Sequence, residues 1–278
     1  MPRTVWYPGH MAKGRREIEE LASKLDVIIE VRDARAPSVT SSPLVETLSQ
    51  IRPVWVVLSK KDLADENCTA RWTGYLASSS RKAWALDLLR QKIGPLKKEL
   101  LSKKPKHREV RLAVVGIPNV GKSQLLNQLT GKRSAKVGGI PGITRGVSWF
   151  KGEGLLVVDS PGILDPGSGK EIHNCLAWLG CTKPEISGGY HLLGMELAGM
   201  LKRRGLWKLL EAKWGLPLEE EDDFTSLERI GKRLGCLVSG GKVDPDLAGR
   251  RFIESFSTGK LGRVTLELPD DLLTGEDK

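Results

Sequence analysis

The chain has 278 residues, of which 44 are Lys or Arg and 34 are Asp or Glu, so its formal net charge is +10. This length suggests about two domains, and the hydrophobic content of 40% excludes an intrinsically disordered chain. The charge suits a nucleic acid, an anionic membrane surface or an acidic protein as partner, and it also serves solubility.

Two further observations bear on location. No apolar run approaches the ~18–20 residues of a membrane span, and residues 1–16 lack the apolar core of a signal peptide. The four cysteines have no metal-ligand spacing, which is typical of reduced thiols. We therefore expect a cytoplasmic protein without a membrane span.

The first third of the chain alternates helical and strand patterns. Its basic first segment, residues 1–25, has apolar side chains at helical spacing that predict a helix over 13–25. Continuous apolar runs, typical of buried strands, follow at 27–31 and 54–58. Three more elements are predicted here: a helix over 66–76, a short strand over 82–86, and a helical stretch over 88–101 that Gly94-Pro95 interrupts.

The alternation continues after a basic linker over 102–108. The next predicted elements are a strand over 111–116, a helix over 122–130 that Gly131 ends, and two strands over 147–150 and 155–158 joined by a turn. Strands that alternate with helices indicate an α/β domain with a mostly parallel sheet.

The pattern changes near residue 165. Residues 171–235 are helix-like, and residues 263–268 alternate like an edge strand. We therefore predict an α/β domain over 1–165, followed by a smaller, mainly helical domain over 166–278.

A phosphate-binding loop lies in the first domain. The sequence GIPNVGKS, Gly116–Ser123, matches the pattern G-x-x-x-x-G-K-[ST] between a predicted strand and a predicted helix. Its glycines let backbone N–H groups face phosphate oxygens, and the helix N-terminus adds a partial positive charge. We expect Lys122 to reach the β- and γ-phosphates and the Ser123 hydroxyl to bind Mg²⁺.

Two downstream segments fit a nucleotide switch. DSPG, Asp159–Gly162, follows an apolar strand, where its carboxylate can hold Mg²⁺ through water and the Gly162 amide can sense a γ-phosphate. The glycine-rich segment 138–146 carries Thr144, which we expect to close over the nucleotide and supply a second hydroxyl to Mg²⁺. Taken alone, this segment also fits a surface loop.

The base-reading motif lies upstream of the phosphate loop. LSKKD, Leu58–Asp62, ends a predicted strand, and a carboxylate there can accept hydrogen bonds from guanine N1–H and the exocyclic amine. Adenine lacks this pair of donors and would leave the carboxylate unpaired, so the motif favours GTP over ATP.

This order of motifs resembles the circularly permuted GTPases. Segments along nearly the whole chain resemble the ribosome biogenesis GTPase A (YlqF-type) family: WYPGHMAKG at 6–14, VRDARAP at 31–37, GIPNVGKS at 116–123, PGITR at 141–145, DSPGI at 159–163 and GCLVSGG at 235–241. The resemblance implies a P-loop GTPase domain of permuted motif order and a helical C-terminal domain that binds RNA or the ribosome. It also implies a late precursor of the large ribosomal subunit, with its rRNA, as the partner.

The resemblance further implies roles for individual residues. It assigns the guanine base to Ser59, Lys60 and Asp62. It assigns the rest of the GTP or GDP to Asn119, Val120, Gly121, Lys122, Ser123, Gln124, Thr144 and Gly162. It assigns Mg²⁺ to Ser123, Thr144 and, through water, Asp159, and it makes Asn119 the position for K⁺. It assigns catalysis to His10, Lys122 and Thr144.

The chain departs from the family pattern near the base and near the attacking water. Ser59 stands where the family usually has Asn, and its shorter side chain predicts a weaker bridge to the phosphate loop and a lower affinity for guanine. The second base loop is best matched by Ala85–Asp87. Ile163 occupies the position from which a Gln orients water in Ras-type enzymes. His10, in a loop expected to be mobile, is therefore the candidate for that task, and a purely structural or RNA-contacting His10 is the alternative.

Three functions remain open on the sequence. The first is a GTP-hydrolysing switch in ribosome assembly, slow alone and stimulated by the ribosomal subunit; we expect it to act as a monomer. The second is a nucleotide-regulated RNA-binding module with incidental hydrolysis. The third is an ATP-using P-loop enzyme, against which LSKKD argues.

Several basic clusters are candidates for RNA contact. They lie at 3–16, 103–111 and 202–208, with a sparser set at Arg250, Arg251, Lys260 and Arg263. Trp6 and Trp149, near expected loops, are the candidates for stacking on bases.

Overall fold

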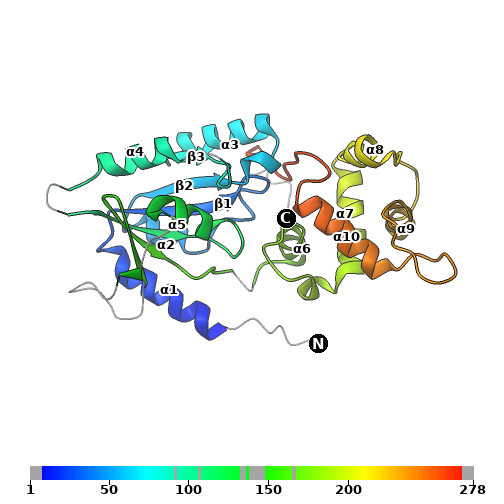
Figure 1. Ribbon diagram of the computed structural model, residues 1–278, viewed down its shortest axis with the longest axis horizontal. Coiled ribbons are helices and arrows are strands. Elements are labelled where there is room, and N and C mark those ends of the chain that lie inside the picture. The colour runs from blue at the N-terminus through cyan, green and yellow to red at the C-terminus, as the bar shows by residue number, and fades with distance from the viewer. Residues whose placement is uncertain are drawn as a thin grey trace. The chain divides into compact units, whose positions relative to one another are not determined.

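The protein is described by a computed structural model that covers residues 8–90, 93–105, 108–131, 136–137, 148–164 and 167–270 (Figure 1). It forms two compact units, of which the first comprises Met1–Pro166 and Thr265–Lys278 and the second Gly167–Val264. Among the described residues, no helix combines the length and the apolar character that crossing a bilayer requires.

A sheet forms the centre of the first unit. Within the described residues it has seven strands in the order β3-β2-β1-β4-β7-β6-β5. The first five in this order are parallel, β6 pairs with β7 in the antiparallel sense, and β5 pairs with β6 in the antiparallel sense. The strands are β1 (Val27–Asp33), β2 (Val54–Ser59), β3 (Ala83–Ala85), β4 (Val110–Val115), β5 (Lys136–Val137), β6 (Trp149–Gly152) and β7 (Leu155–Asp159).

The central strands are buried along their whole length. All residues of β1 and β2 are buried, as expected of parallel strands covered on both faces. This burial explains why continuous apolar runs predicted them correctly and confirms the α/β fold with its mostly parallel sheet. The short β5 was not predicted.

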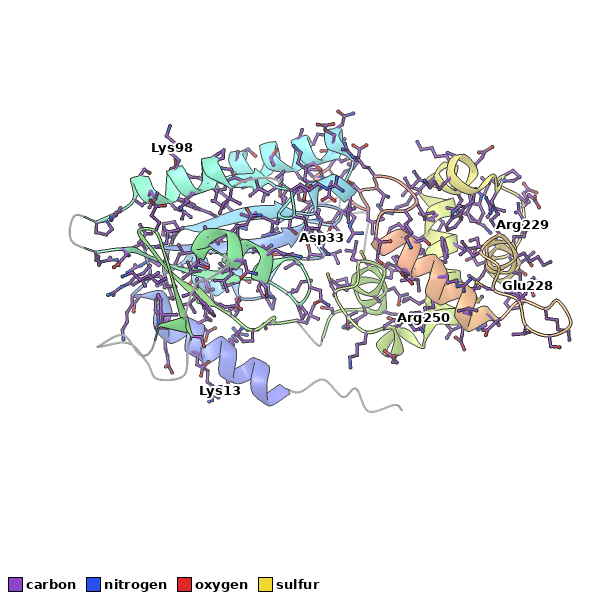
Figure 2. All side chains as sticks on the ribbon, viewed as in Figure 1. Lys13, Asp33, Lys98, Glu228, Arg229 and Arg250 are labelled. Carbon is purple, nitrogen blue, oxygen red and sulfur yellow. The ribbon has the colours of Figure 1, made fainter. Side chains whose placement is uncertain are left out.

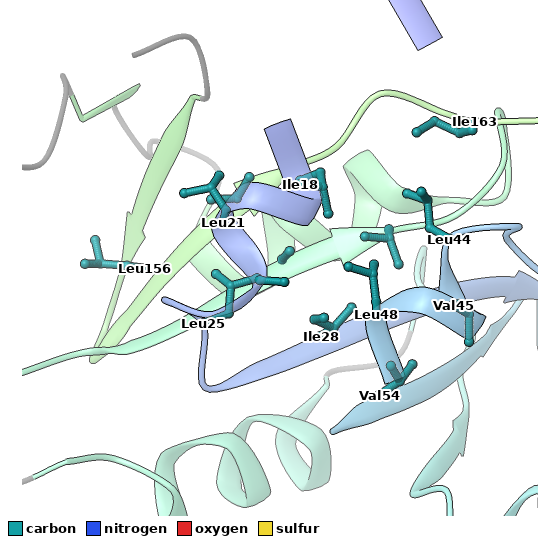
Figure 3. Packing of buried hydrophobic residues seen from close by; sticks show 14 of the residues in the cluster. Ile18, Leu21, Leu25, Ile28, Leu44, Val45, Leu48, Val54, Leu156 and Ile163 are labelled. Carbon is teal, nitrogen blue, oxygen red and sulfur yellow. The ribbon is translucent and has the colours of Figure 1, made fainter. Parts of the chain in front are cut away.

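Helices cover this sheet. Those of the first unit are α1 (Pro8–Ala22), α2 (Val45–Ser49), the 3₁₀ helix η1 (Lys61–Leu63), α3 (Glu66–Ser78), α4 (Gly94–Ser102) and α5 (Lys122–Thr130). Figure 3 shows Ile18, Leu21 and Leu25 gathered with Leu48 of α2 and Ile28 of β1 in one apolar cluster. Ile18 and Leu21 therefore form the apolar face with which α1 docks on the sheet, and Leu25, which follows the helix, extends the same contact.

Two helix boundaries differ from the sequence prediction. Helix α1 begins at Pro8 and ends at Ala22, so the backbone of His10 is helical and the predicted mobile loop around it is wrong. Helix α4 begins at Gly94, with Pro95 in its first turn. A proline there lacks only an N–H that has no partner within the helix, so it starts α4 rather than interrupting a longer helix.

The second unit is helical. Its elements are α6 (Lys170–Trp178), the 3₁₀ helix η2 (Pro184–Ser187), α7 (Tyr190–Arg203), α8 (Lys208–Trp214), α9 (Asp223–Arg233) and α10 (Pro245–Ser257). Helices α7, α9 and α10 pack against one another. Asp222 and Asp244 accept hydrogen bonds from the first turns of α9 and α10, at 2.7 and 3.0 Å, and thereby fix where these helices begin.

The last described residues return to the first unit. We call residues 265–270 the C-terminal strap. The Leu266 N–H donates to the Arg35 carbonyl at 2.7 Å, and the Trp72 indole N–H donates to the Glu267 carbonyl at 2.9 Å. These single hydrogen bonds form no ladder, so the predicted edge strand over 263–268 is wrong. The helical unit accordingly ends at Val264 and not at residue 278.

Candidate nucleotide-binding site

The phosphate loop joins β4 to α5, as the sequence predicted. Its backbone turns through left-handed conformations at Asn119, with a φ of 58°, and at Gly121, with a φ of 103°. The Lys122 side chain is buried, and its ammonium group donates to the Ile117 carbonyl at 2.7 Å. Lys122 therefore lies against its own loop, at the N-terminus of α5, where the helix dipole favours an anion.

Ser59 connects the end of β2 to this loop. Its buried hydroxyl is within hydrogen-bond distance of the Val120 carbonyl and lies 2.9 Å from the Arg32 carbonyl. A Cβ built on Gly121 would lie 3.6 Å from the Ser59 Cβ and 3.4 Å from Leu88 Cδ1. The end of the base-reading strand, the phosphate loop and the segment after β3 therefore meet at one place.

The predicted base-reading residues lie just beyond β2. Lys60 adopts a left-handed conformation with a φ of 55°, and Asp62 lies half-buried in η1. The β2–β3 register sets Leu58 opposite Ala85, so the predicted second base loop, Ala85–Asp87, lies beside them. Asp87 accepts backbone hydrogen bonds from residues 89 and 90 at 3.0 and 3.1 Å, which closes that loop into a tight turn.

A buried cluster of charges supports Lys60 and was not predicted. The Lys60 ammonium group lies 2.8 Å from Asp33 Oδ2, and Arg35 contacts both oxygens of the same carboxylate at 3.0 and 2.8 Å. Asp33, labelled at the end of β1 in Figure 2, is fully buried, as is Arg35. Three charged residues directly after a buried apolar run, in VRDARAP, were the signal for this cluster.

The electrostatics of the cluster are internally balanced. Burial alone would raise the pKa of the Asp33 carboxyl, but the charges and hydrogen bonds of Arg35 and Lys60 hold it well below its usual range. The carboxylate therefore stays ionised at any physiological pH. It thereby fixes the position of Lys60, which belongs to the base-reading motif LSKKD.

Asp159 ends β7 in the opposite electrostatic situation. Burial raises the pKa of its carboxyl, and the nearby charge of Lys122 only partly offsets this effect. Its Oδ1 is buried and has no hydrogen-bond partner among the described residues. A buried carboxylate oxygen without a partner, beside a phosphate loop, fits a Mg²⁺ site. Ser123, the other predicted Mg²⁺ ligand in the described part of the chain, lies in the first turn of α5.

The loop after β7 packs on both the phosphate loop and α1. A Cβ at Gly162 would lie 2.7 Å from the Pro118 nitrogen and 2.9 Å from its Cα, so only glycine allows this approach. A Cβ at Gly14 of α1 would lie 2.2 Å from Pro161 Cγ. Helix α1 and the phosphate loop therefore contact the same four-residue motif.

Some predicted residues cannot be placed or lie elsewhere. Thr144 and its segment 138–146 fall outside the described residues, as does Trp6. For His10 the structure gives the backbone, in the first turn of α1 and four residues before Gly14. Trp149 is 1% exposed within the apolar cluster, so its predicted role in stacking on bases is wrong.

Comparison with known proteins identifies similar chains. A family model described as "50S ribosome-binding GTPase" matches residues 111–182. The chain is 33% identical to the ribosome biogenesis GTPase A of Bacillus cereus over an alignment of length 284, which covers 96% of this chain and 94% of that protein. It is 32% identical to the ribosome biogenesis GTPase A of Thermotoga maritima over 269 aligned residues, which cover 96% and 95%.

Solved structures agree in fold. The crystal structure of GNP-bound YlqF from Thermotoga maritima matches with a TM-score of 0.65 at 26% identity, covering 93% of this chain and 99% of that chain. A GDP-bound YlqF structure matches with a TM-score of 0.66 at 26% identity, covering 92% and 100%.

Proposed function

Because the chain belongs to the ribosome biogenesis GTPase A family, we propose that it is a GTP-controlled switch that binds a late precursor of the large ribosomal subunit and promotes its maturation. The chain is a GTPase of circularly permuted motif order, and it binds GTP and GDP. The rRNA of the precursor, and the roles of the site residues below, belong to our proposal.

A series of contacts from the phosphate loop to α1 supports this proposal. Gly162 lies against Pro118 of the phosphate loop, and Pro161 lies against Gly14 of α1. A γ-phosphate that accepts a hydrogen bond from the Gly162 amide would hold the loop after β7 in place, and its loss would release that loop. Helix α1 rests on the same loop and carries exposed cations, Lys13, Arg15 and Arg16, that suit rRNA phosphates. The nucleotide state would thus change the position of the basic surface of α1.

The nucleotide is held from two sides. The carboxylate of Asp62 accepts hydrogen bonds from guanine, with Ser59 and Lys60 supporting it, and Asn119–Gln124 surround the phosphates. Asp159 would hold Mg²⁺ through water, and Ser123 and Thr144 would bind it directly; the ion would neutralise phosphate charge. Asn119 is the proposed ligand of K⁺.

His10 is our candidate for positioning the attacking water. Ile163, at the position of the Ras-type Gln, is apolar and packed in the core, so it cannot orient water. His10 precedes Gly14 by one helical turn, and Gly14 lies on Pro161 beside Gly162. A neutral imidazole there can accept a hydrogen bond from water near pH 7. Lys122 and Thr144 complete the proposed catalytic set.

The cytoplasm is the proposed location and a monomer the proposed active form. All four cysteines are described, and none forms a disulfide. Thiols of this kind are usual in a reducing compartment.

GTP turnover tests the switch. We expect purified large-subunit precursors to stimulate turnover in K⁺ buffer and to do so less in Na⁺ buffer. On precursors, the variant His10→Ala should hydrolyse GTP about 100-fold more slowly than the unaltered chain. It should retain nucleotide affinity, because the histidine would act on water alone. Lys122→Ala is the reference for impaired phosphate binding and should fail to bind GTP tightly.

Two results would point elsewhere. If precursors leave turnover unchanged in both salts, the switch is wrong. If His10→Ala hydrolyses normally on precursors, the absence of a polar group at Ile163 favours the second candidate, a nucleotide-regulated RNA-binding module with incidental hydrolysis.

A further inference from the structure

The helical unit contains an open cleft that no part of the GTPase mechanism uses. Its volume is about 520 Å³, which is within the ~300–1,000 Å³ range of small-ligand pockets. Residues from α8 and α10 line it, together with Leu234, which follows α9, and Lys260, which follows α10. Figure 2 labels Arg250 on α10, next to the cleft residue Arg251.

A tryptophan forms one wall of this cleft. Trp214, the last residue of α8, is half-buried, whereas Trp149 and Trp207 are almost fully buried. Its ring centroid lies 6.1 Å from that of Phe252, whose side chain is in the core, and its carbonyl accepts a hydrogen bond from Arg233 Nε at 2.8 Å. The indole is thus supported from behind and keeps accessible surface in the cleft.

Cations surround the indole. Lys213, Arg251 and Lys260 line the cleft, and Glu254 is the acidic residue among the lining side chains, so the local excess is two positive charges. Arg251 is fixed because its guanidinium donates to the Leu234 carbonyl at 2.8 Å. Lys213 and Lys260 are exposed and form no ion pair with any residue that the structure describes. Both can therefore approach a phosphate.

We propose that this cleft binds an unpaired nucleotide of RNA, with the base stacked on Trp214 and the adjoining phosphates held by Lys213 and Lys260. Stacking on an aromatic face beside cations is how proteins bind single strands with little sequence preference. The inference rests on the proposed function, because it assumes an rRNA partner, and it goes further by naming the place and the strandedness.

Glu254 distinguishes RNA from an acidic peptide. Its carboxylate would repel aspartate or glutamate side chains seated in the cleft. It can, however, accept a hydrogen bond from the exocyclic amine of a base, as carboxylates do from cytosine N4. The cleft should therefore prefer oligocytidine to oligouridine, since the two pyrimidines differ in having an amine or a carbonyl at that position.

Binding of labelled single-stranded RNA to the full chain tests the cleft. We expect Trp214→Leu to weaken binding of a cytidine decamer about tenfold and Trp214→Phe to retain most of it, because an aromatic face remains. Lys213→Gln or Lys260→Gln should reduce the slope of log affinity against log salt concentration by about 0.7 for each phosphate that is no longer neutralised. Glu254→Gln should remove the preference for cytidine.

Matched controls make the outcome specific. Lys232→Gln removes an exposed charge of α9 that lies outside the cleft and outside the basic clusters named from the sequence, and it should change binding less than Lys213→Gln. Circular dichroism and the thermal midpoint check that each variant is folded. Equal reductions in affinity from Lys232→Gln and Lys213→Gln would mean diffuse charge rather than a site and would overturn the proposal.

Failure of the cleft and failure of the proposed function are distinguishable. If Trp214→Leu binds RNA and subunit precursors as the unaltered chain does, the cleft assignment is wrong and the proposed function stands. If the unaltered chain binds no RNA and no precursors in either nucleotide state, both are wrong. Binding of a glutamate decamer that depends on Trp214, without binding of RNA, would make the cleft a peptide site instead.

Discussion

Ser59 contacts the phosphate loop through a single hydroxyl group. A hydroxyl donates a single hydrogen, yet Ser59 Oγ lies near two carbonyl oxygens, those of Arg32 and Val120. The hydroxyl can satisfy only one of them at a time. The bridge from Ser59 to the phosphate loop therefore competes with the hydrogen bond to Arg32, and the lower guanine affinity expected from the missing Asn remains a prediction for a binding measurement.

Asp62 should control which base is bound. Asp62→Asn replaces an acceptor with an amide that also donates, which suits the extra carbonyl of xanthine. We expect the affinity for GDP to fall and that for xanthosine diphosphate to rise, as measured by isothermal titration. Glu66→Gln, an equivalent change at an exposed position on α3, is the control. An unaltered base preference would remove Asp62 from the base site.

Asp159 should make the protein less stable as the pH rises. Because burial raises its folded-state pKa above the unfolded value of about 3.9, the stability it contributes is present below that value and is lost as pH rises through the folded pKa. Asp159→Asn should therefore raise the thermal midpoint at pH 7, measured without nucleotide or Mg²⁺, and the gain should shrink toward pH ~4.

Asp26 provides the opposite case. Burial alone would raise its pKa, but the hydrogen bonds and charges of Arg108 and Arg111 lower it. Its contribution is therefore present above the unfolded pKa and is lost as pH falls, so Asp26→Asn should lower the midpoint at pH 7. If Asp159→Asn lowers the midpoint as Asp26→Asn does, the electrostatic account of Asp159 is wrong.

At the scale of elements, the loop after β7 and the phosphate loop pack too closely for an added side chain at Gly162. The loop after β7 lies against the phosphate loop at Gly162, where a methyl group would lie 2.7 Å from the Pro118 nitrogen. Gly162→Ala should therefore displace one loop from the other and weaken GDP and GTP-analogue binding about tenfold.

Gly169 is the matched control for this substitution. A Cβ there meets nothing within 4 Å, so Gly169→Ala should bind nucleotide normally. Fluorescence titration with a labelled nucleotide measures both variants. Normal binding by Gly162→Ala would show that the two loops separate without cost.

The elements predicted well are those with a local cause. Buried parallel strands read as continuous apolar runs, and the phosphate loop is specified by contiguous residues, so β1, β2, β4 and α5 could be predicted. The pairing of Lys60 with Asp33 and Arg35 could not, because Lys60 follows β2 whereas Asp33 and Arg35 lie at the end of β1, and these strands pair only in the folded sheet. The same limit separates Trp149 from Trp214, since exposure depends on neighbours distant in the sequence.

In the C-terminal strap, the alternation of apolar residues reflects burial and not strand formation. Residues 263–268 alternate because Val264 and Leu266 are buried while their neighbours are less so, and not because the segment joins a sheet. Its backbone groups find single partners in Arg35 and Trp72 instead.

At the scale of the whole molecule, the first unit is built from both ends of the sequence. A chain that ends at Val264 would lack the strap, including buried Leu266, and we expect its thermal midpoint to fall by roughly 5–10 °C. A chain that ends at Asp270 keeps the strap and serves as the control. Near-ultraviolet circular dichroism with GDP titration measures both. Equal midpoints for the two chains would show that the strap does not stabilise the fold.

Part of the net charge of +10 lies in two groups of exposed cations. For a member of this family, the exposed cations of α1 and those of the cleft near Trp214 are expected to face RNA. They lie in different units, so each unit carries its own proposed contact with RNA.

The strap also sets an order of events during synthesis. The sheet and phosphate loop leave the ribosome first, but Arg35 and Trp72 must wait for Leu266 and Glu267 until the whole helical unit has been translated. At about 5–20 residues per second this delay is on the order of ten seconds. During that interval the nascent chain holds the nucleotide-binding unit without the support that residues 265–270 supply.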